Sequence, residues 1–229
     1  MRIAVFWNDD NPSWVDRMGL WEEALGRPGD TWTTYVTPRG ELPSTPEDHD
    51  AYVLTGSAHS VNDPEQTWIP ATQAFIRAAV AGGRPVFGSC FGHQLLATTF
   101  GGQVGANPSG RFVVGVEEVF PLADAGPLGG YRVLEAHGEC VRVLPQGARW
   151  HATSRTAEFE CFTLGDHVLA VQGHPELSVP EVRDRILAPR EADGRLTLGE
   201  AQRARDSLDE GHDGPRMLDG IARFLRREG

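Results

Sequence analysis

The first hundred residues alternate short apolar runs with amphipathic stretches, and this alternation most strongly limits the possible folds. The segment 66–81 carries apolar residues at helical spacing, and the segment after Cys90 is predicted to be helical through Phe100. Ser13 is placed to cap an earlier helix that runs through about Leu25. Strands that alternate with helices in this way predict an α/β fold with a mostly parallel central sheet and helices on both faces. The predicted strands are 3–7, 32–36, 51–54 and 85–88.

The second half of the chain is β-rich and then helical. Its β-rich segments are joined by Gly and Pro turns, and we expect them to form an antiparallel flank or to turn back into the main sheet. A last apolar strand covers 168–172. No low-complexity linker or internal repeat divides the sequence, so one domain over residues 1–229 is predicted. The β-rich segments are 113–120, 131–136, 140–144 and 158–164, and the tail helices are 179–187, 198–208 and 215–227.

Charge and cysteine content argue against several classes of protein. The formal net charge is −11, whereas nucleic-acid and anionic-membrane surfaces need a basic footprint, so neither partner is expected. All 21 basic residues are arginine, so no lysine can form a Schiff base. The three cysteines do not make a disulfide framework, the start lacks a signal-peptide pattern, and no stretch has the length of a membrane span. We therefore expect a cytoplasmic protein with reduced thiols.

The strongest local motif is Gly88-Ser89-Cys90-Phe91-Gly92, at the junction between a predicted strand and a predicted helix. A strand that runs directly into a helix through Gly-x-Cys-x-Gly makes a tight turn, which presents one side chain at the carboxyl edge of a parallel sheet. The glycines allow strained backbone angles and keep bulk away from a substrate. The positive end of the helix dipole favours a thiolate. Cys90 is therefore the candidate nucleophile.

A candidate base follows the last predicted strand, in Gly173-His174-Pro175-Glu176. Residues two apart in an extended segment point the same way, so Glu176 can reach the far nitrogen of His174 and fix its tautomer. Cys90 and His174 are far apart in sequence, but each follows a predicted strand, so the fold would bring them together at one sheet edge. The sequence thus predicts a Cys90–His174–Glu176 triad.

Together these motifs resemble the signature blocks of the class I glutamine amidotransferases, nearest to the subgroup that resembles the amidotransferase domain of GMP synthase. The matching blocks keep their order and spacing over about residues 1–180. The resemblance implies a flavodoxin-like class I amidotransferase architecture with a helical C-terminal tail and no cofactor. No metal site is expected, because no ligand spacing is seen for His49, His151, His167 or His212. The blocks are 88–94, Gly101-Gly102 and 173–176, supported by 54–57 and 107–111.

The resemblance also implies roles for individual residues. Cys90 would attack the γ-amide carbon of a γ-glutamyl substrate and form a thioester, while His174 would protonate the departing amine. Backbone N–H groups would hold the oxyanion, and a few further residues would contact the substrate. The oxyanion residues are Ser57 and Phe91, and the substrate-binding residues are Gly56, Gln94 and His137, the last in a segment whose backbone grips glutamine in the family.

Three departures from the family pattern lie at the walls of the predicted pocket. The loop 56–58 reads Gly-Ser-Ala where Gly-Gly-Pro is usual, and Phe91 stands where Leu or Met is usual. The segment 172–174 reads Gln-Gly-His where Gln-Phe-His is common. The nucleophile and the base are unchanged. The departures therefore bear on the substrate and the partner more than on bond cleavage.

Three functions are compatible with these residues. The leading prediction is a glutaminase that supplies ammonia to a separate synthase subunit, because the chain has no Gly-rich ATP-binding motif of its own. The alternative is a stand-alone γ-glutamyl hydrolase or peptidase, which would act on γ-glutamyl amides or peptides with a larger leaving group. A third reading is a non-catalytic binding protein, against which the intact triad argues. The sequence does not identify the leaving group.

Overall fold

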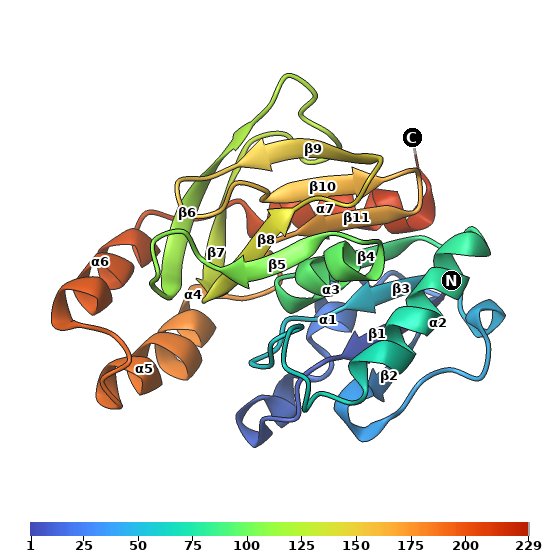
Figure 1. Ribbon diagram of the computed structural model, residues 1–229, viewed down its shortest axis with the longest axis horizontal. Coiled ribbons are helices and arrows are strands. Elements are labelled where there is room, and N and C mark those ends of the chain that lie inside the picture. Colours follow the sequence, from blue (N-terminus) through green and yellow to red (C-terminus); the bar gives the residue numbers. More distant parts are fainter. Residues whose placement is uncertain (229) are drawn as a thin grey trace.

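The computed structural model describes residues 1–228 and is built around a nine-stranded mixed sheet (Figure 1). The strand order is β2-β1-β3-β4-β11-β10-β9-β6-β7. The first five strands in this order run parallel to one another. Each of the remaining four pairs antiparallel with its neighbours. The parallel strands are β1 (Arg2–Trp7), β2 (Thr31–Val36), β3 (Ala51–Leu54), β4 (Val86–Ser89) and β11 (Val168–Val171). The antiparallel strands are β10 (Cys161–Leu164), β9 (Ala148–Thr153), β6 (Val113–Pro121) and β7 (Tyr131–His137).

Helices cover both faces of the parallel strands. Helices α2 (Ile69–Ala81) and α3 (Phe91–Thr99) bury one face, while α1 (Leu20–Leu25) and α7 (Gly214–Arg226) bury the other. Strands β3, β4 and β11 are buried along their whole length, which is why they read as continuous apolar runs in the sequence. The two hydrophobic clusters that result hold the carboxyl edge of these strands in a fixed position.

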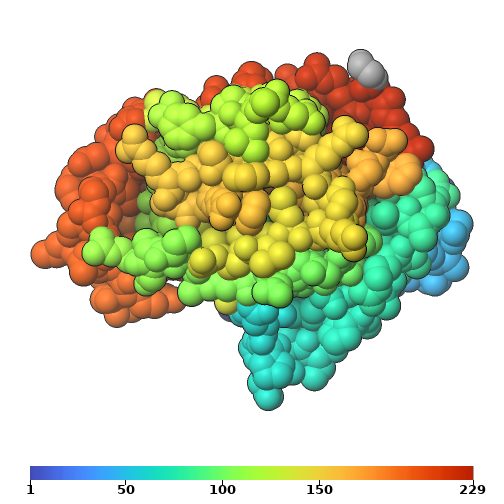
Figure 2. Space-filling model, turned by 45° about the horizontal axis from the view of Figure 1, so that its top comes forward, coloured from blue at the N-terminus to red at the C-terminus, as the bar shows by residue number. Residues whose placement is uncertain are grey.

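The antiparallel half of the sheet curls back toward the parallel half. The N–H of His174, just past β11, donates to the carbonyl of Leu134 on β7, at 2.7 Å. This bond joins two strands that are not neighbours in the sheet order, and it brings the end of β7 beside the carboxyl edge of β11. Strands β5 (Gln103–Ala106) and β8 (Glu139–Val143) form a separate two-stranded sheet. Figure 2 shows the antiparallel strands, in yellow and light green, as one continuous face beside the orange C-terminal helices.

The chain after β11 forms a cluster of short helices against β6 and β7 (Figure 1). The first begins at a capping box in which Ser178 and Glu181 bond each other's backbone, and Thr197 and Glu200 repeat this device at the start of α6. A third hydrophobic cluster joins these helices to Val116 of the sheet. The elements are α4 (Val179–Glu181), a π-helical turn (Val182–Leu187), α5 (Ala188–Ala192) and α6 (Leu198–Leu208).

The expected α/β fold is confirmed, and both alternatives for the β-rich segments occur. Strands β6, β7, β9 and β10 turn back into the main sheet, and β8 joins the separate flank. The helix predicted from Ser13 through Leu25 is wrong, because Pro12–Arg17 is a 3-10 turn capped by the Asn11 side chain and α1 begins only at Leu20. Strands β5 and β9 fall where the sequence predicts none. None of the helices in residues 1–228 is long and apolar enough to cross a membrane.

Candidate active site

Cys90 occupies a strained turn between β4 and α3, with φ of 51° and ψ of −106°. Such a conformation costs a residue other than glycine about 1–3 kcal/mol, so the surroundings must hold it. The Cys90 N–H donates to the carbonyl of Val171 (3.0 Å), and the Gly92 N–H donates to the carbonyl of Thr55 (3.1 Å). A Cβ at Gly92 would collide with the carbonyl oxygen of Leu54, so this position requires glycine. The motif thus fixes the thiol at the carboxyl edge of the sheet.

His174 and Glu176 follow β11 and are joined side chain to side chain. His174 Nδ1 lies 2.8 Å from Glu176 Oε1. The Ser89 hydroxyl lies 3.3 Å from Glu176 Oε2 and 3.0 Å from the carbonyl of Gly173, with both oxygens as acceptors. Because Nδ1 faces a carboxylate it carries a proton, which leaves Nε2 for Cys90. Ser89, beside Cys90, therefore also steadies the Glu176 carboxylate that holds the His174 ring.

The charge state of His174 follows from its neighbours. Burial favours the neutral ring and would lower its pKa, but the negative charges of Cys90 and Glu176, and hydrogen bonds to both, outweigh burial. The pKa of His174 is therefore raised well above its ordinary value. An imidazolium at this position can supply a proton to a leaving group.

The loop 55–58 after β3 is fixed by polar residues that follow β1. The Asn8 N–H donates to Thr55 Oγ1 (2.9 Å), and the Asn8 side-chain amide donates to the Thr55 carbonyl (3.0 Å). Asp9 Oδ2 accepts the N–H of Ala58 at 3.2 Å. Asn8 and Asp9 are both buried, so these bonds are shielded from water. The loop is therefore held at both of its ends.

Gly56, Ser57 and Phe91 lie around the thiol and the base. A Cβ at Gly56 would be 2.7 Å from His174 Cε1 and 3.6 Å from Cys90 Cβ, so this glycine touches both catalytic candidates. Ser57 lines the pocket described below. Phe91 is the first residue of α3, so its N–H has no acceptor within the helix. Of the residues predicted to contact the oxyanion or the substrate, Gly56, Ser57 and Phe91 are thus grouped near Cys90.

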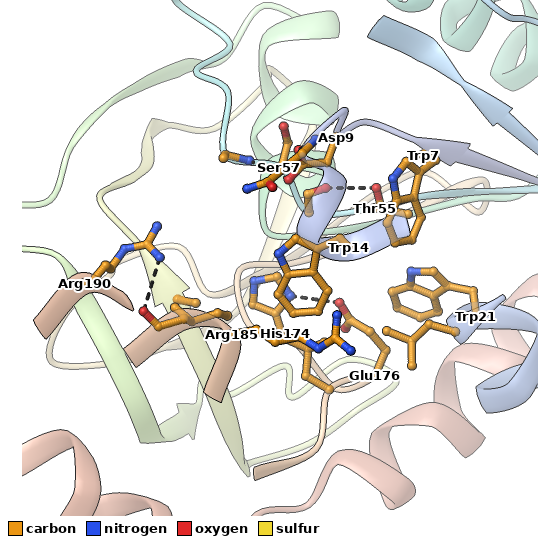
Figure 3. Close-up of a pocket in the computed structure, with 17 residues that line it drawn as sticks. Trp7, Asp9, Trp14, Trp21, Thr55, Ser57, His174, Glu176, Arg185 and Arg190 are labelled. Atoms are coloured by element: carbon orange, nitrogen blue, oxygen red, sulfur yellow. Dashed lines mark hydrogen bonds and ion pairs between the residues drawn. The ribbon is translucent and has the colours of Figure 1, made fainter. Parts of the chain in front are cut away.

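A pocket opens in front of His174 and Glu176, and indole rings form much of its wall (Figure 3). Trp7 ends β1, Trp14 belongs to the 3-10 turn, and Trp21 belongs to α1. Cys90 is 4% exposed and lies beside the pocket, next to Gly56. None of the three tryptophans was singled out by the sequence, because each is separated from the motifs by the fold.

Ion pairs fasten the pocket wall. Arg185, on the π-helical turn, binds Asp16 of the 3-10 turn through two hydrogen bonds of 2.8 and 2.6 Å. Its guanidinium also lies over the Trp14 ring, 5.4 Å from the ring centre. Arg17 pairs with Glu181 at 2.6 Å. The N-terminal turn and the segment after β11 thereby close the pocket from two sides.

The side chains of Gln94 and His137 are turned into the protein. Gln94 Nε2 donates to the carbonyl of Glu139 at 2.8 Å. His137 Nδ1 lies 3.0 Å from Asn107 Oδ1 and 3.0 Å from the Glu139 carbonyl. Within the described residues the pocket is lined by Ala136 and not by either of these two side chains. A contact between this segment and a substrate would therefore come from its backbone.

Glu135 and Glu160 form a buried carboxyl pair that the sequence did not indicate. Both are fully buried; Ser154 donates its hydroxyl to Glu160 Oε1 at 2.6 Å, and Glu135 Oε2 lies 3.3 Å from His137 Nε2. Burial, together with the charge of Glu160, raises the pKa of Glu135 well above its ordinary value. Burial also raises the pKa of Glu160 to about 7. The two carboxyl groups can share a hydrogen bond only while a proton remains on the pair.

Replacing Glu160 with glutamine is expected to make the protein relatively more stable as pH rises. The pKa of the Glu160 carboxyl is about 7 in the folded protein against an ordinary value of 4.5, so its stabilising protonated form is lost as pH rises through this interval. The amide stays neutral, so the stability of the variant relative to wild type should increase by on the order of 1–3 kcal/mol. Urea unfolding at a series of pH values measures this, with the exposed Glu158→Gln as control. A difference independent of pH would contradict the assignment.

Asp9, Asp10 and His59 are the one group in residues 1–228 with metal-ligand spacing, their ligand atoms all lying within 4.8 Å of one another. Asp9 uses one carboxylate oxygen for the N–H of Asn11 (2.8 Å) and the other for Ala58 (3.2 Å). His59 Nε2 lies 3.1 Å from Asp10 Oδ1. These contacts account for the group as part of the loop structure.

A thiol at a strained strand–helix turn and a histidine–carboxylate pair on a mixed α/β sheet are the groups that nucleophilic attack on an acyl carbon requires. The chain belongs to the class I glutamine amidotransferase family, whose model, described as glutamine amidotransferase class-I, matches residues 35–190.

The relatives carry two kinds of names. "Gamma-glutamyl peptidase 4" of Arabidopsis thaliana is 27% identical over 219 residues, which cover 89% of this chain and 85% of that protein. A glutamine-hydrolysing GMP synthase of Thermomicrobium roseum is 33% identical over 130 residues, which cover 55% of this chain and 23% of that protein. The crystal structure of a glutamine amidotransferase from Thermotoga maritima covers 98% of both chains with a TM-score of 0.75 and 22% identity, and establishes the fold.

Proposed function

We propose that this protein is a cysteine-dependent hydrolase of γ-glutamyl amides, with Cys90, His174 and Glu176 as its triad. Family membership supports cleavage of a γ-glutamyl amide bond. The strained backbone of Cys90 supports its role as the nucleophile, and the raised pKa of His174 beside Cys90 and Glu176 supports its role as the proton donor. The single observation that carries the choice of leaving group is the tryptophan wall beside His174 and Glu176.

The first half of the proposed reaction transfers the γ-glutamyl group to sulfur. The Cys90 thiolate attacks the γ-carbonyl carbon, an S–C bond forms, and the carbonyl electron pair moves onto oxygen. The N–H groups of Ser57 and Phe91 stabilise this oxyanion. When the intermediate collapses, the C–N bond breaks and the amine departs with the proton of His174 Nε2. A γ-glutamyl thioester and a neutral imidazole remain.

The second half returns the enzyme to its starting state. Neutral His174 takes a proton from a water molecule as the water oxygen attacks the thioester carbon. The second oxyanion collapses, the C–S bond breaks, and the thiolate is again paired with the imidazolium. Glu176 keeps the ring in one orientation through both halves, with Ser89 holding its second oxygen. The products are glutamate and the released amine.

The pocket wall favours an amine larger than ammonia. Trp14 is partly exposed and presents apolar area next to the base that would protonate the leaving group, while the buried rings of Trp7 and Trp21 complete the lining. Ammonia has no apolar area to bury against such a surface, whereas an apolar amino acid or an aromatic amine does. The extensive match to a γ-glutamyl peptidase agrees with this choice. We therefore favour the stand-alone hydrolase among the functions left open by the sequence.

Glutamine hydrolysis for a separate synthase is the second candidate. One relative, a component of a glutamine-hydrolysing GMP synthase from Natronomonas pharaonis, is 30% identical over 155 residues, which cover 64% of this chain and 76% of that protein. In this reading the same triad releases ammonia, and the aromatic wall would face a partner protein. Such an enzyme is expected to be slow with glutamine alone and faster when its synthase is added.

Turnover of a substrate panel by the purified protein distinguishes the two candidates. The panel is glutamine, γ-glutamylglycine and γ-glutamylphenylalanine, with glutamate release as the common measurement. The hydrolase proposal expects kcat/KM to rise from glutamine to γ-glutamylphenylalanine, by about tenfold for each ~1.4 kcal/mol of added contact. Preference for glutamine over both peptides would overturn the choice of leaving group and favour the glutaminase. Failure of all three substrates would count against the proposed function itself.

Replacing Glu176 with glutamine is expected to move the alkaline limb of the kcat/KM profile to lower pH. The carboxylate helps to raise the pKa of His174, so a neutral amide lowers that pKa, and the imidazolium is lost earlier as pH rises. The rate should fall less than on loss of the nucleophile, because orientation is weakened while the reacting groups remain. A pH series with γ-glutamylphenylalanine measures both effects. An alkaline limb that does not move would show that Glu176 does not set the charge of His174.

A further inference from the structure

Arg190, at the pocket wall on α5, is a cation without a carboxylate partner among residues 1–228. None of the ion pairs in the described chain includes it, whereas Arg185 on the same wall is paired with Asp16. The side-chain hydrogen bond that it makes within this part of the chain is a long one, 3.5 Å to the carbonyl of Ile186 on the preceding turn. The chain has 32 acidic residues against 21 basic ones, so acidic partners are not scarce. An unpaired, partly buried guanidinium therefore needs an explanation.

The guanidinium is held in place by an aromatic ring. Its central carbon lies over the Phe112 ring, 4.1 Å from the ring centre. Burial lowers the pKa of Arg190, which shows that the charge has lost part of its hydration. Arginine nevertheless stays protonated at every physiological pH. A positive charge that is desolvated and stacked on a ring is prepared to bind an anion with two hydrogen bonds.

The position of Arg190 indicates which part of a substrate it would meet. A Cβ at Gly138 would lie 3.5 Å from Phe112, so the Phe112–Arg190 stack adjoins the turn between β7 and β8. Ala136, just before this turn, lines the pocket, and its carbonyl accepts the Cys90 thiol at 3.8 Å. Figure 3 shows Arg190 on one side of His174 and the labelled Trp7 and Trp21 on the other. The acyl group and the leaving group extend to opposite sides of the bond that is cut.

We propose that Arg190 binds the α-carboxylate of the γ-glutamyl group, an assignment that rests on the proposed function. The glutamyl chain runs from the carbonyl carbon at Cys90 along the end of β7, and its carboxylate pairs with the guanidinium over Phe112. The leaving group lies against the tryptophans on the other side. The site therefore selects acyl groups that carry a carboxylate at the α position, and it accepts varied amines.

Paired substrates test this assignment directly. The first is γ-glutamyl-4-nitroanilide, and the second is 4-aminobutanoyl-4-nitroanilide, which lacks only the α-carboxylate. A hydrogen-bonded charge contact is worth about 1.5–3 kcal/mol, so Arg190→Gln should lower kcat/KM for the first substrate by about 10–100-fold, mainly through KM. The second substrate should be slow with wild type and unchanged by the substitution. Equal losses on both substrates, or no loss on the first, would overturn the proposal.

Control variants separate binding from folding and from general charge. Arg190→Lys keeps the charge but loses the planar fork, so it should recover part of the lost kcat/KM. Arg195→Gln removes a neighbouring cation that is paired with Asp193 and does not line the pocket, and it should match wild type. Thermal unfolding of each variant identifies any that is misfolded. If Arg195→Gln and Arg190→Gln had the same effect, a long-range charge effect would replace the contact.

A measurement independent of turnover separates this proposal from the proposed function. The rate of Cys90 alkylation by 6-diazo-5-oxonorleucine, a glutamine analogue with an α-carboxylate, is compared with that by iodoacetamide, and mass spectrometry follows both. Arg190→Gln should slow the first reaction at least tenfold and leave the second within about twofold. If Arg190→Gln slows only the first alkylation but wild type hydrolyses no γ-glutamyl substrate, the carboxylate site is supported and the hydrolase function is rejected. Equal rates of alkylation by 6-diazo-5-oxonorleucine for Arg190→Gln and wild type, in a protein that hydrolyses γ-glutamyl substrates, would support the proposed function and reject the carboxylate site.

Discussion

Replacement of Cys90 with alanine is expected to abolish hydrolysis of γ-glutamyl substrates, with a fall in kcat on the order of 10⁴-fold or more. No other thiol can substitute, because burial raises the pKa of Cys140 to about 11 and raises that of Cys161 further. Alanine also fits the turn about as well as cysteine does, so the protein should still fold. Glutamate release and thermal unfolding measure the two properties.

Cys161→Ala is the matched control for the nucleophile. Cys161 is also buried, on β10 between β9 and β11, and it should be dispensable for turnover. A thiol reagent should label wild type at Cys90 before the other cysteines. Residual activity of Cys90→Ala above about one part in a hundred would reject the nucleophile assignment.

Replacement of Gly56 with alanine is expected to lower kcat/KM by about 100-fold or more while the fold survives. The added Cβ would stand 2.7 Å from His174 Cε1, closer than real contacts allow, so the imidazole or the loop must shift and the alignment of His174 with Cys90 is disturbed. A displacement of the base by about 1 Å is enough for a loss of this size. Hydrolysis of γ-glutamylphenylalanine at the pH optimum measures the effect.

The control for Gly56 is Gly199→Ala on α6, where the new Cβ would meet only the end of the Arg203 side chain at 3.5 Å. That variant should keep full activity and gain a little stability, since alanine is the better helix former. If Gly56→Ala were as active as Gly199→Ala, the base would have more freedom than the structure indicates.

The parts of the fold that depend on local pattern were predictable. Strands β3, β4 and β11 are short apolar runs bounded by turn residues, and their burial on both faces requires that composition. The cysteine turn was predictable because glycines on either side are a local steric requirement, as the close approach of Gly92 to Leu54 shows. The contact between His174 and Glu176 was expected from alternation along an extended segment, but β11 ends at Val171 and residues 175–176 form a turn, so the contact exists for a different reason. These features lie within single segments of the chain.

The features that were missed depend on contacts between distant segments. The sequence 12–17 has a Pro start and a capping residue, but Gly19 separates it from α1, so one predicted helix is two elements. Trp14 lies at the pocket wall on a turn that is fastened by contacts between distant segments, such as the pair of Asp16 with Arg185, which lies 169 positions later. The sequence also did not predict the buried Glu135–Glu160 pair, since the residues next to each glutamate in the sequence are of ordinary apolar and polar types.

The division of the site between two sets of segments has an evolutionary consequence. Cys90, His174 and the loop 55–58, to which we assign the chemistry, are attached to the parallel strands, where glycine contacts and buried hydrogen bonds leave little freedom for substitution. The tryptophans and arginines of the wall belong largely to the 3-10 turn, α1 and the short helices after β11, which are joined by ion pairs at the surface. Descendants of one ancestral gene can therefore exchange the wall, and with it the amine that is released, while the bond-breaking residues are inherited unchanged.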